Sequence, residues 1–293
     1  MNNFLIGADP EVFVRKNGTP ISAHGLIPGT KKEPHKTDYG AIQVDGMALE
    51  FNIDPTPSKD FDTFNLNIVK TLADLKSAAG EGHSLSVQPV QEFDPDYLKA
   101  QPEEAKELGC DPDFNAYTLA QNPRPDGERA FRTGAGHIHV GWGADIPVEN
   151  EEHIEICAGF IKMLDATVGM FMTYIDRDPR RRELYGCAGA FRPKSYGVEY
   201  RTPSNVWIRN RGRRQMMHIL INRAISSHCS GITPEQLTNI SEEEIVRIIN
   251  TGDWEVAEMI MDRLGNNRGQ STWRIWTAIR SEMEVVNSAE IPN

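Results

Sequence analysis

Cysteine is scarce in this chain, and its four cysteines lie far apart in the sequence. They form no Cys-x-x-Cys or Cys-x-x-His pair, so neither a zinc ribbon nor a disulfide framework is supported, and a reducing cytoplasm suits the chain best. The N-terminus lacks the basic start and long apolar core of a signal peptide, and no stretch approaches the roughly 18–20 apolar residues that span a bilayer. We therefore expect a cytoplasmic protein with no membrane partner.

Two motifs of nucleotide and ester chemistry are also missing. The chain has no Gly-x-x-x-x-Gly-Lys-Ser/Thr phosphate loop and no Gly-x-Ser-x-Gly nucleophile elbow. These absences count against a P-loop ATPase and against a serine hydrolase. A net charge of −11 argues against nonspecific binding of nucleic acid, although it does not exclude a local basic groove.

The pattern of apolar residues predicts the fold class. With 293 residues, of which 39% are hydrophobic, the chain is long enough for one large domain or two small ones. Short strands are expected before residue 54, at 138–142 and at 198–201, and a helix capped by Ser58 is expected over 61–79. Strands and helices come in blocks rather than in alternation, which favours an α+β fold with a mainly antiparallel sheet. Further helices are expected over 149–173, 216–227, 242–250, 254–264 and 272–286.

Residues 92–126 are rich in Pro, Asp and Asn, with a short helix expected at 102–108. Tyr97, Phe114 and Tyr117 lie in this segment, and a flexible linker rarely carries such aromatic residues. We therefore interpret the segment as an ordered insertion.

Two acidic motifs are candidates for metal binding. Asp9 and Glu11, two residues apart on an expected strand, would project from the same face, and hard cations such as magnesium prefer oxygen ligands of this kind. A tight turn with exposed acids is the alternative. Glu50 lies between Leu49 and Phe51 in a strand that looks buried. Because a lone buried carboxylate is very costly, Glu50 either pairs with a basic residue or binds a metal.

A pair of histidines, His137 and His139, shares one face of an expected strand, and nearby glycines allow a large ligand to approach the backbone. A His-x-His pair often binds zinc together with a third His or Cys. No third ligand of that kind lies close in the sequence. The pair therefore favours a mixed oxygen and nitrogen site or a phosphate site, and a structural pair is the alternative.

The most basic part of the chain lies within residues 176–205. Arginine suits bidentate capture of phosphate or carboxylate. Glu199 and Arg201 would share a strand face, which could place a metal ligand beside a phosphate clamp. Surface charge with local ion pairs, or a patch that binds nucleic acid, are the alternatives.

Together these motifs resemble a known family, the phage-associated carboxylate–amine ligases (amidoligases, COOH-NH2 ligase type 2) of the glutamine synthetase and glutamate–cysteine ligase superfamily. The resemblance covers roughly residues 5–210 in the right order, and its last segment is the most specific. It is carried by GADPEVFV at 7–14, QVDGMALEFNI at 43–53, GCDPDFNAYT at 109–118, GAGHIHVGW at 134–142 and RRELYGCAGAFRPKSYGVEYRTPSNVW at 181–207.

The resemblance implies a single catalytic domain over 1–293, with the motifs within 5–210 and a helical C-terminal part over 211–293. Its fold would be α+β, a curved and mainly antiparallel sheet of the glutamine synthetase catalytic type with helices packed on one face. Its activity would be that of a ligase that joins a carboxylate to an amine through an acyl phosphate, using ATP and Mg2+, with Mn2+ as a substitute. The insertion at 92–126 would form part of a lid that excludes water.

The resemblance also implies roles for individual residues. Asp9 stands where relatives commonly have Glu. The metal ligands would be Asp9, Glu11, Glu50, His137 and Glu199. The nucleotide phosphates would contact His139, Arg201, Lys194 and Arg182. The catalytic residues would be Glu199, Arg201, Arg192 and Arg182.

Other functions remain open at this stage. A phosphotransferase of the guanidino-kinase type could use the same fold, and a phage accessory protein could bind a nucleotide without catalysis. The substrates would be small or peptide-like carboxylates and amines, whose identity the sequence does not give, and nucleic acid is not indicated. The oligomeric state is equally open. For a phage-encoded chain, the location would be the cytoplasm of the infected bacterium.

Overall fold

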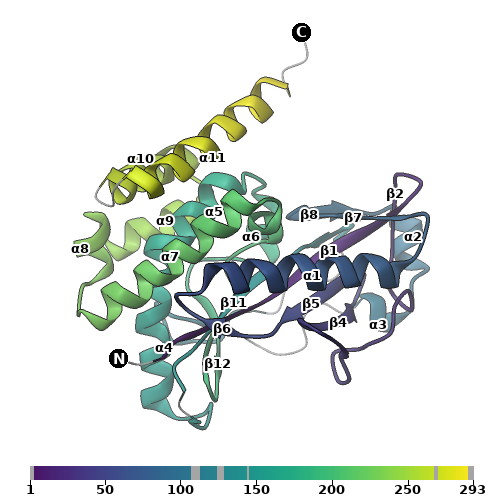
Figure 1. The fold of residues 1–293 in the computed structure, drawn as a ribbon, viewed down its shortest axis with the longest axis horizontal. Helices are drawn as coiled ribbons and strands as arrows, with labels where there is room; N and C mark the ends of the chain where they lie inside the picture. Colours follow the sequence, from purple (N-terminus) through teal and green to yellow (C-terminus); the bar gives the residue numbers. More distant parts are fainter. Residues whose placement is uncertain (1–2, 107–112, 124–128, 144, 267–269, 290–293) are drawn as a thin grey trace.

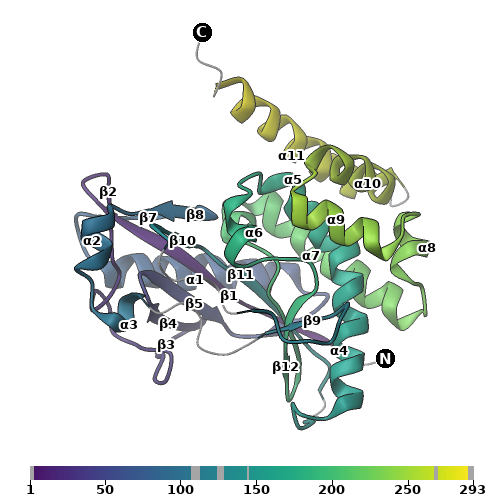
Figure 2. The same ribbon diagram turned by 180° about the vertical axis from the view of Figure 1, so that it is seen from behind.

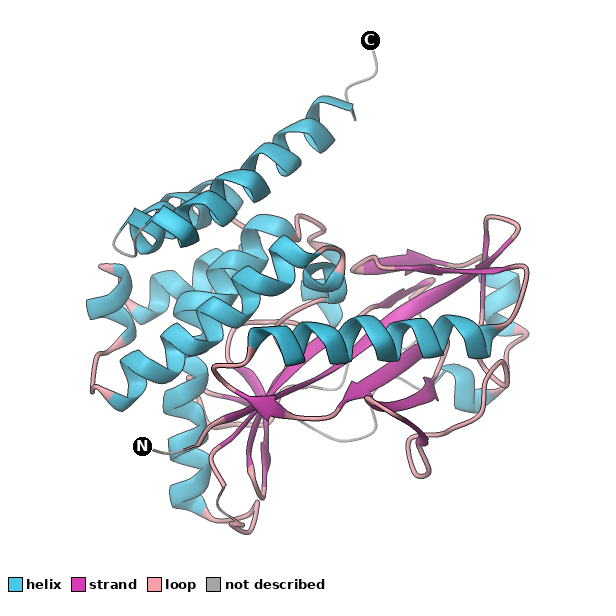
Figure 3. Cartoon of the chain, in the orientation of Figure 1, coloured by secondary structure: helices cyan, strands magenta, loops and turns pink. Residues whose placement is uncertain are grey.

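The computed structural model describes residues 3–106, 113–123, 129–143, 145–266 and 270–289. Strands occupy one half of the molecule and the C-terminal helices gather in the other half (Figures 1 and 3). The last helix, α11 (Gln270–Ala289), extends away from the remaining helices toward the C-terminus (Figure 1). The expected short helix at 102–108 is present as α3 (Glu103–Lys106), and the remainder of that expectation lies outside the described residues.

The main sheet is built around its first strand. The strand order is β3-β4-β5-β1-β11-β13-β12-β9, and every pairing between these neighbours is antiparallel. Strands β2, β6 and β7 also pair with β1, while β8 and β10 form a separate pair. The strands are β1 (Leu5–Lys16), β2 (Thr19–Ile21), β3 (His35–Thr37), β4 (Gly40–Asp45), β5 (Ala48–Ile53), β6 (Thr56–Pro57), β7 (His83–Ser86), β8 (Val90–Glu92), β9 (Phe114–Asn115), β10 (Phe131–Thr133), β11 (Gly136–Gly141), β12 (Ala190–Lys194) and β13 (Gly197–Tyr200).

The two faces of the sheet differ in character because side chains alternate along a strand. On the central strands one set of alternate residues is apolar and belongs to the main core, as Val12, Ile138 and Tyr200 do. The intervening residues, such as Glu11, His137 and Glu199, carry charge or polarity and line a cavity. One face therefore packs against helices, and the other carries the charged and polar side chains that line the cavity.

Helices cover the apolar face. Residues of α1, α4, α5 and α7 share the main core with the central strands. Helix α1 crosses in front of β5 in Figure 1 and behind the strands in Figure 2. The longer helical elements are α1 (Phe61–Ala79), α4 (Glu151–Leu164), a π-helical turn (Asp165–Gly169), α5 (Met170–Ile175), α7 (Arg211–Cys229), α9 (Glu242–Thr251) and α10 (Trp254–Asn266).

Two short helices correct the expectation of helices on one face only. Phe13 and Ala48 face away from the main core and form a second apolar cluster with Leu98 of α2 and Ala105 of α3. These helices, with β8, therefore pack on the opposite side of the sheet, beside its charged residues. The remaining short elements are α2 (Pro95–Lys99), α6 (Arg180–Leu184), α8 (Pro234–Thr238) and a 3-10 turn (Asn205–Ile208).

Several local expectations need correction. Asp60, not Ser58, caps α1, because its Oδ1 accepts the backbone N–H of Thr63 at 3.0 Å. The helix expected over 149–173 extends to Ile175, but the π-helical turn at Asp165 divides it into α4 and α5. Strand β12 was not expected, because its apolar residues alternate with Arg192 and Lys194 in a segment that reads as a basic loop.

One helical stretch, Glu151–Ile175, is long and apolar enough to cross a membrane, judged by length and composition alone. Its most apolar window is 83% buried inside the protein. Burial of this extent is typical of a core helix, because its apolar side chains pack against the sheet.

Candidate active site

A cavity of about 320 Å3 lies on the charged face of the sheet. Its walls come from β1, the β4–β5 hairpin, β11, the β12–β13 hairpin and the segments around residues 31, 132 and 181. The acidic and histidine side chains that line it are Asp9, Glu11, Asp45, Glu50, His137 and Glu199, and the basic ones are Lys31, Arg132, Arg181, Arg192, Lys194 and Arg201. Groups of both charges therefore converge in one space.

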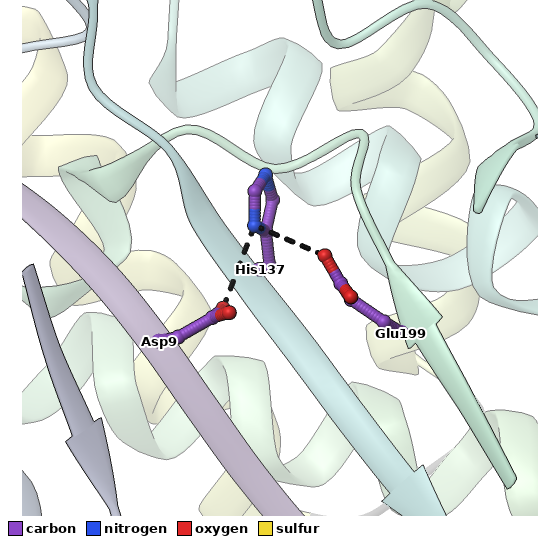
Figure 4. Close-up of side chains that lie close together, drawn as sticks. All are labelled: Asp9, His137 and Glu199. Carbon is purple, nitrogen blue, oxygen red and sulfur yellow. Dashed lines mark ion pairs between the residues drawn. The ribbon is translucent and has the colours of Figure 1, made fainter. Parts of the chain in front are cut away.

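Asp9, His137 and Glu199 form the first cluster (Figure 4). They come from the adjacent strands β1, β11 and β13, and Asp9 lies directly opposite His137 in the β1–β11 register. His137 Nδ1 lies 3.5 Å from Asp9 Oδ1 and 3.5 Å from Glu199 Oε1. Burial and the charge of Arg201 lower the pKa of His137, which favours the neutral imidazole that can act as a ligand.

His139 lies on the same strand face as His137 but outside the residues that line the cavity. Its Nε2 lies 3.1 Å from Asp9 Oδ2, and its Nδ1 lies 2.7 Å from the Tyr196 hydroxyl. Burial lowers the pKa of His139, but the charge and hydrogen bond of Asp9 together with the charge of Glu199 outweigh burial, so the pKa is raised. His139 thus borders the first cluster through Asp9.

Glu199 is the most enclosed carboxylate of the first cluster, with 2% of its side chain exposed. It forms an ion pair with Arg201, and its Oε2 lies 2.7 Å from Lys194 Nζ and 3.6 Å from Arg192 Nη1. Burial alone would raise the pKa of Glu199, but the Arg201 guanidinium together with His139 and His137 outweighs burial and holds the pKa well below its usual range. Glu199 is therefore a carboxylate anion at neutral pH.

Glu11, Asp45 and Glu50 form the second cluster, each offering an oxygen within 4.8 Å of the others. Glu11 lies directly opposite Glu50 in the β1–β5 register, and Asp45 lies at the end of β4 before the hairpin turn. Gln43 Nε2 donates to Glu50 Oε1 at 3.0 Å, and the backbone N–H of Ala135 donates to Glu11 Oε2 at 2.8 Å. The sheet register itself brings these acids together.

The electrostatics of the second cluster are those of crowded, buried acids. Burial and the charge of Asp45 raise the pKa of Glu11 to about 8, and burial with the charge of Asp9 raises the pKa of Glu50 well above its usual value. Lys31 Nζ lies 2.8 Å from Asp45 Oδ1 and supplies one compensating charge. Such a cluster favours a positive ion, because each carboxylate disfavours ionisation of its neighbours.

The basic wall of the cavity corrects one residue assignment. Arg192, Lys194 and Arg201 line the cavity, but Arg182 does not. Its guanidinium donates to the backbone carbonyls of Asp178 and Asp176, on the helical side of the chain. Arg182 and its neighbour Arg181 are adjacent on α6, so the helical rotation that points Arg181 toward the cavity points Arg182 away from it. The neighbouring Arg181 is the one that lines the cavity.

Arg181, Asp45, Lys31 and Asp113 were not identified as site residues from the sequence. Asp113 Oδ2 lies 3.3 Å from Arg201 Nε and orients that guanidinium. Asp45 and Asp113 lie inside motifs that carry the family resemblance, so a signal for them was present. Lys31 and Arg181 stand in runs of consecutive basic residues, from which one member cannot be selected without the backbone geometry.

Residues 128–253 match the family described as phage phiEco32-like COOH.NH2 ligase-type 2. The resemblance to the carboxylate–amine ligases is confirmed. The matched segment holds His137, His139 and the whole β12–β13 hairpin. The match supports the interpretation of this chain as an enzyme of the ligase class. The remaining carboxylates of the two clusters precede the matched segment; they are Asp9, Glu11, Asp45 and Glu50.

Two solved structures share the fold of this chain. A structure titled "Apo GmaS without ligand" matches with a TM-score of 0.53 at 11% identity, covering 99% of this chain and 70% of that one. A GmaS/ADP complex matches with a TM-score of 0.50 at 11% identity, covering 99% and 72%. These likenesses show a common mixed fold of helices and mostly antiparallel sheet.

A third solved structure is longer than this chain. It is a bifunctional glutathione synthetase from Pasteurella multocida, with a TM-score of 0.48 at 11% identity. The match covers 94% of this chain, which spans 46% of the length of that protein. A comparison with curated proteins gave no match.

Proposed function

We propose that this chain is an ATP-dependent and Mg2+-dependent carboxylate–amine ligase that forms an amide through an acyl phosphate. One observation carries the proposal. Two carboxylate clusters, Asp9–His137–Glu199 and Glu11–Asp45–Glu50, line the same cavity as a basic wall. Carboxylates bind divalent cations, and the negative oxygens of a triphosphate bind both those cations and basic side chains. The match to a ligase family supports the same activity.

The donor set fits divalent cations. The first cluster combines carboxylate oxygens with one imidazole nitrogen, and the second offers oxygens alone. Within the described residues, Asp9 Oδ1 is buried and has no hydrogen-bond partner, although His137 lies near it. We assign Asp9, His137 and Glu199 to one cation, and Glu11 and Glu50 to another. Magnesium or manganese held there would neutralise phosphate charge and polarise the γ-phosphoryl group.

The basic wall is assigned to the triphosphate and the transferred phosphoryl group. Arg192, Lys194 and Arg201 surround Glu199 on the β12–β13 hairpin, so their charges are fixed before a substrate enters. Preorganised cations stabilise negative charge that develops in transfer without reorganising during the step. We place His139 beside the phosphates, because it borders the first cluster through Asp9. In the GmaS structure that contains ADP, the fold shared with this chain holds a nucleotide.

The reaction follows from these positions. A substrate carboxylate oxygen attacks the γ-phosphorus of ATP, the bond to the β–γ bridging oxygen breaks, and ADP leaves with that oxygen. Arg192, Lys194 and Arg201 hold the transferring phosphoryl group and neutralise its charge. An amine then attacks the acyl carbon of the acyl phosphate, the bond from that carbon to the phosphate oxygen breaks, and the amine nitrogen passes a proton to the departing phosphate or to solvent. The products are an amide, ADP, phosphate and that proton.

The acyl phosphate must be protected from water, and we assign part of that role to the insertion at 92–126. Glu104 of α3 borders a second cavity of about 540 Å3, which shares Lys31, Asp45 and Gly46 with the first. The described part of the insertion thus lies next to an extension of the candidate site. We propose that substrate bound across both cavities displaces water from the reacting centre.

The remaining parts of the proposal concern the whole chain. We propose that residues 1–293 form one catalytic domain of the glutamine synthetase type, with a curved sheet and motifs within 5–210. Its substrates are a small or peptide-like carboxylate and an amine. Because the reaction uses ATP, we place it in the cytoplasm, that of an infected bacterium for a phage-encoded chain.

The test is a screen for ADP release with pools of carboxylates and amines, coupled to mass spectrometry. The expected result is ADP release that requires one member of each pool and Mg2+, with a product lighter by one water than its two precursors. A phosphorylated product without an amide would identify a phosphotransferase instead. Binding of ATP without ADP release, whatever amine is supplied, would indicate a non-catalytic nucleotide-binding protein.

A further inference from the structure

A carboxylate is buried beneath the candidate site, on the helical side of the sheet. Asp165 has 0% of its surface exposed and begins the π-helical turn between α4 and α5. Burying a carboxylate in a core is unfavourable unless its hydrogen-bonding needs are met. π-Helical turns are rare in proteins, and those that occur are often found at functional sites. The partners of Asp165 therefore show what this residue holds in place.

Asp165 joins three segments that are distant in the sequence. Its Oδ1 accepts the hydroxyl of Tyr200 at 2.5 Å. Its Oδ2 accepts the backbone N–H of Gly189 at 2.7 Å and the hydroxyl of Tyr117 at 3.1 Å. Tyr200 belongs to β13, Gly189 directly precedes β12, and Tyr117 follows β9. One side chain thus connects the last three strands of the main sheet.

Each of these segments carries groups of the candidate site. Tyr200 lies between Glu199 and Arg201, and its side chain enters the core while that of Glu199 lines the cavity. Gly189 leads into β12, which carries Arg192 and Lys194. The third segment, with Tyr117, also holds the carboxylate that contacts Arg201. A displacement of any of the three would move a charged group of the basic wall or the carboxylate that contacts Arg201.

The π-helical turn is shaped to receive Tyr200. Gly169 ends the turn, and a Cβ placed on Gly169 would lie 3.1 Å from the Tyr200 hydroxyl and 2.7 Å from Ile249 Cδ1. The absence of a side chain at this position therefore leaves room for the hydroxyl that reaches Asp165. Thr167, in the same turn, donates instead to Met163 O at 3.0 Å, within the helix. Asp165 is thus directed toward the sheet, while Thr167 stays within its own helix.

We propose that Asp165 is a positioning residue for the ligase reaction. It holds β13, β12 and the Tyr117 segment in the arrangement in which Arg192, Lys194 and Arg201 converge on Glu199 and on the nucleotide phosphates. The residue touches no substrate. Its effect passes through the three hydrogen bonds, and the inference rests on the proposed use of ATP.

The test measures binding of the non-hydrolysable analogue AMP-PNP with Mg2+ by calorimetry, at a temperature where circular dichroism shows each variant fully folded. Asp165→Asn keeps the shape of the side chain and removes its charge, and Tyr200→Phe removes one hydroxyl. We expect both to weaken AMP-PNP binding at least tenfold. Thr167→Val is the matched control, because it removes a buried hydrogen bond of the same turn that does not reach the sheet. It should lower the melting temperature while leaving the affinity within twofold.

These measurements distinguish a failure of the proposed ligase function from a failure of the positioning role of Asp165. If the parent protein does not bind AMP-PNP with Mg2+, the proposed function fails. If the parent binds and Asp165→Asn binds equally well while folded, the positioning role is wrong and Asp165 serves stability alone. Should Asp165→Asn not fold, the single variants Tyr200→Phe and Tyr117→Phe decide, and unchanged affinity in both would overturn the inference.

Discussion

Glu11 and Glu50 lie directly opposite each other on the antiparallel strands β1 and β5, so the sheet register places a half-buried and a buried carboxylate side by side. Asp45 completes the group from the end of β4, and Lys31 pairs with it at 2.8 Å. Burial and the crowding of these acids raise the pKa values of Glu11 and Glu50, so without a cation these two acids hold protons at neutral pH. A bound cation would favour their ionised forms, so cation binding tests the role of this cluster directly.

Lys31 competes with a divalent cation for Asp45 if this cluster binds metal. Lys31→Met should therefore strengthen binding of Mn2+, measured alone by electron paramagnetic resonance. Because the Lys31 side chain is 48% exposed and screened by solvent, we expect an effect of about threefold to tenfold. Lys32→Met, a neighbouring lysine that borders the second cavity alone, is the control and should leave the affinity unchanged. Equal affinity in the parent and Lys31→Met would argue against a cation beside Asp45.

The carboxylates of both clusters should be essential for turnover. Glu199→Gln and Glu50→Gln preserve side-chain shape and remove a charge from each cluster. Each should lower the rate of ADP release by at least about 100-fold, the size of effect seen when a preorganised charge is removed from an active site. The circular dichroism spectrum should stay unchanged. Glu81→Gln, at an exposed position after α1, serves as the control. Near-normal turnover in both cluster variants would refute the site assignment.

The two kinds of arginine should behave differently. Arg192→Ala removes a guanidinium that lines the cavity, and it should raise the KM for ATP by about tenfold through the loss of a charge-assisted contact. Arg182→Ala removes contacts to backbone carbonyls of Asp176 and Asp178, so it should lower the melting temperature and leave the KM unchanged. Steady-state kinetics with ATP as the varied substrate measures both. The reverse pattern would restore Arg182 to the nucleotide site and remove Arg192 from it.

Asp165 should also make stability depend on pH. Burial raises its pKa to about 7, against the opposing hydrogen bonds from Tyr200, Gly189 and Tyr117, while the same carboxyl in the unfolded chain has its ordinary pKa of 3.8. At a pH between 3.8 and about 7, Asp165 is therefore mostly ionised in the unfolded state and mostly protonated in the folded state. The contribution of Asp165 to the free energy of unfolding is therefore complete below pH 3.8, falls as pH rises, and is lost above about pH 7.

Asp165→Asn removes this titration. The stability of the variant relative to the parent should rise by about 3 kcal/mol between pH 4.5 and 7.5, since each pKa unit corresponds to about 1.4 kcal/mol. Urea unfolding at the two pH values measures the difference. A constant gap between the variant and the parent would mean that the folded and unfolded states ionise Asp165 alike.

Much of this arrangement was accessible from the sequence because short-range alternation is strong. The two-residue spacing of Asp9 with Glu11, of His137 with His139, and of Glu199 with Arg201 correctly predicted which side chains share a strand face. The blocks of strands and helices also predicted a mixed fold with a mostly antiparallel sheet. The structure then placed Asp9 and Glu11 in separate clusters within one cavity.

What the sequence did not reveal depends on register and on long-range contacts. Asp45 joins Glu11 because β4, β5 and β1 pair in one register, and no local pattern specifies that pairing. The choice between Arg181 and Arg182 depends on the rotation of a five-residue helix. Asp165 was hidden within an apolar helical pattern, and its partners lie 24 to 48 residues away. The family resemblance supplied the roles of the residues, which geometry alone does not assign.

A crystal structure grown with Mn2+ and AMP-PNP, with anomalous diffraction collected to locate manganese, tests the metal and nucleotide sites together. We expect one manganese within the Asp9–His137–Glu199 cluster and another within the Glu11–Asp45–Glu50 cluster. The triphosphate should lie between them and against Arg192, Lys194 and Arg201. Nucleotide bound elsewhere, or manganese absent from both clusters while AMP-PNP is present, would rule out this cavity as the active site.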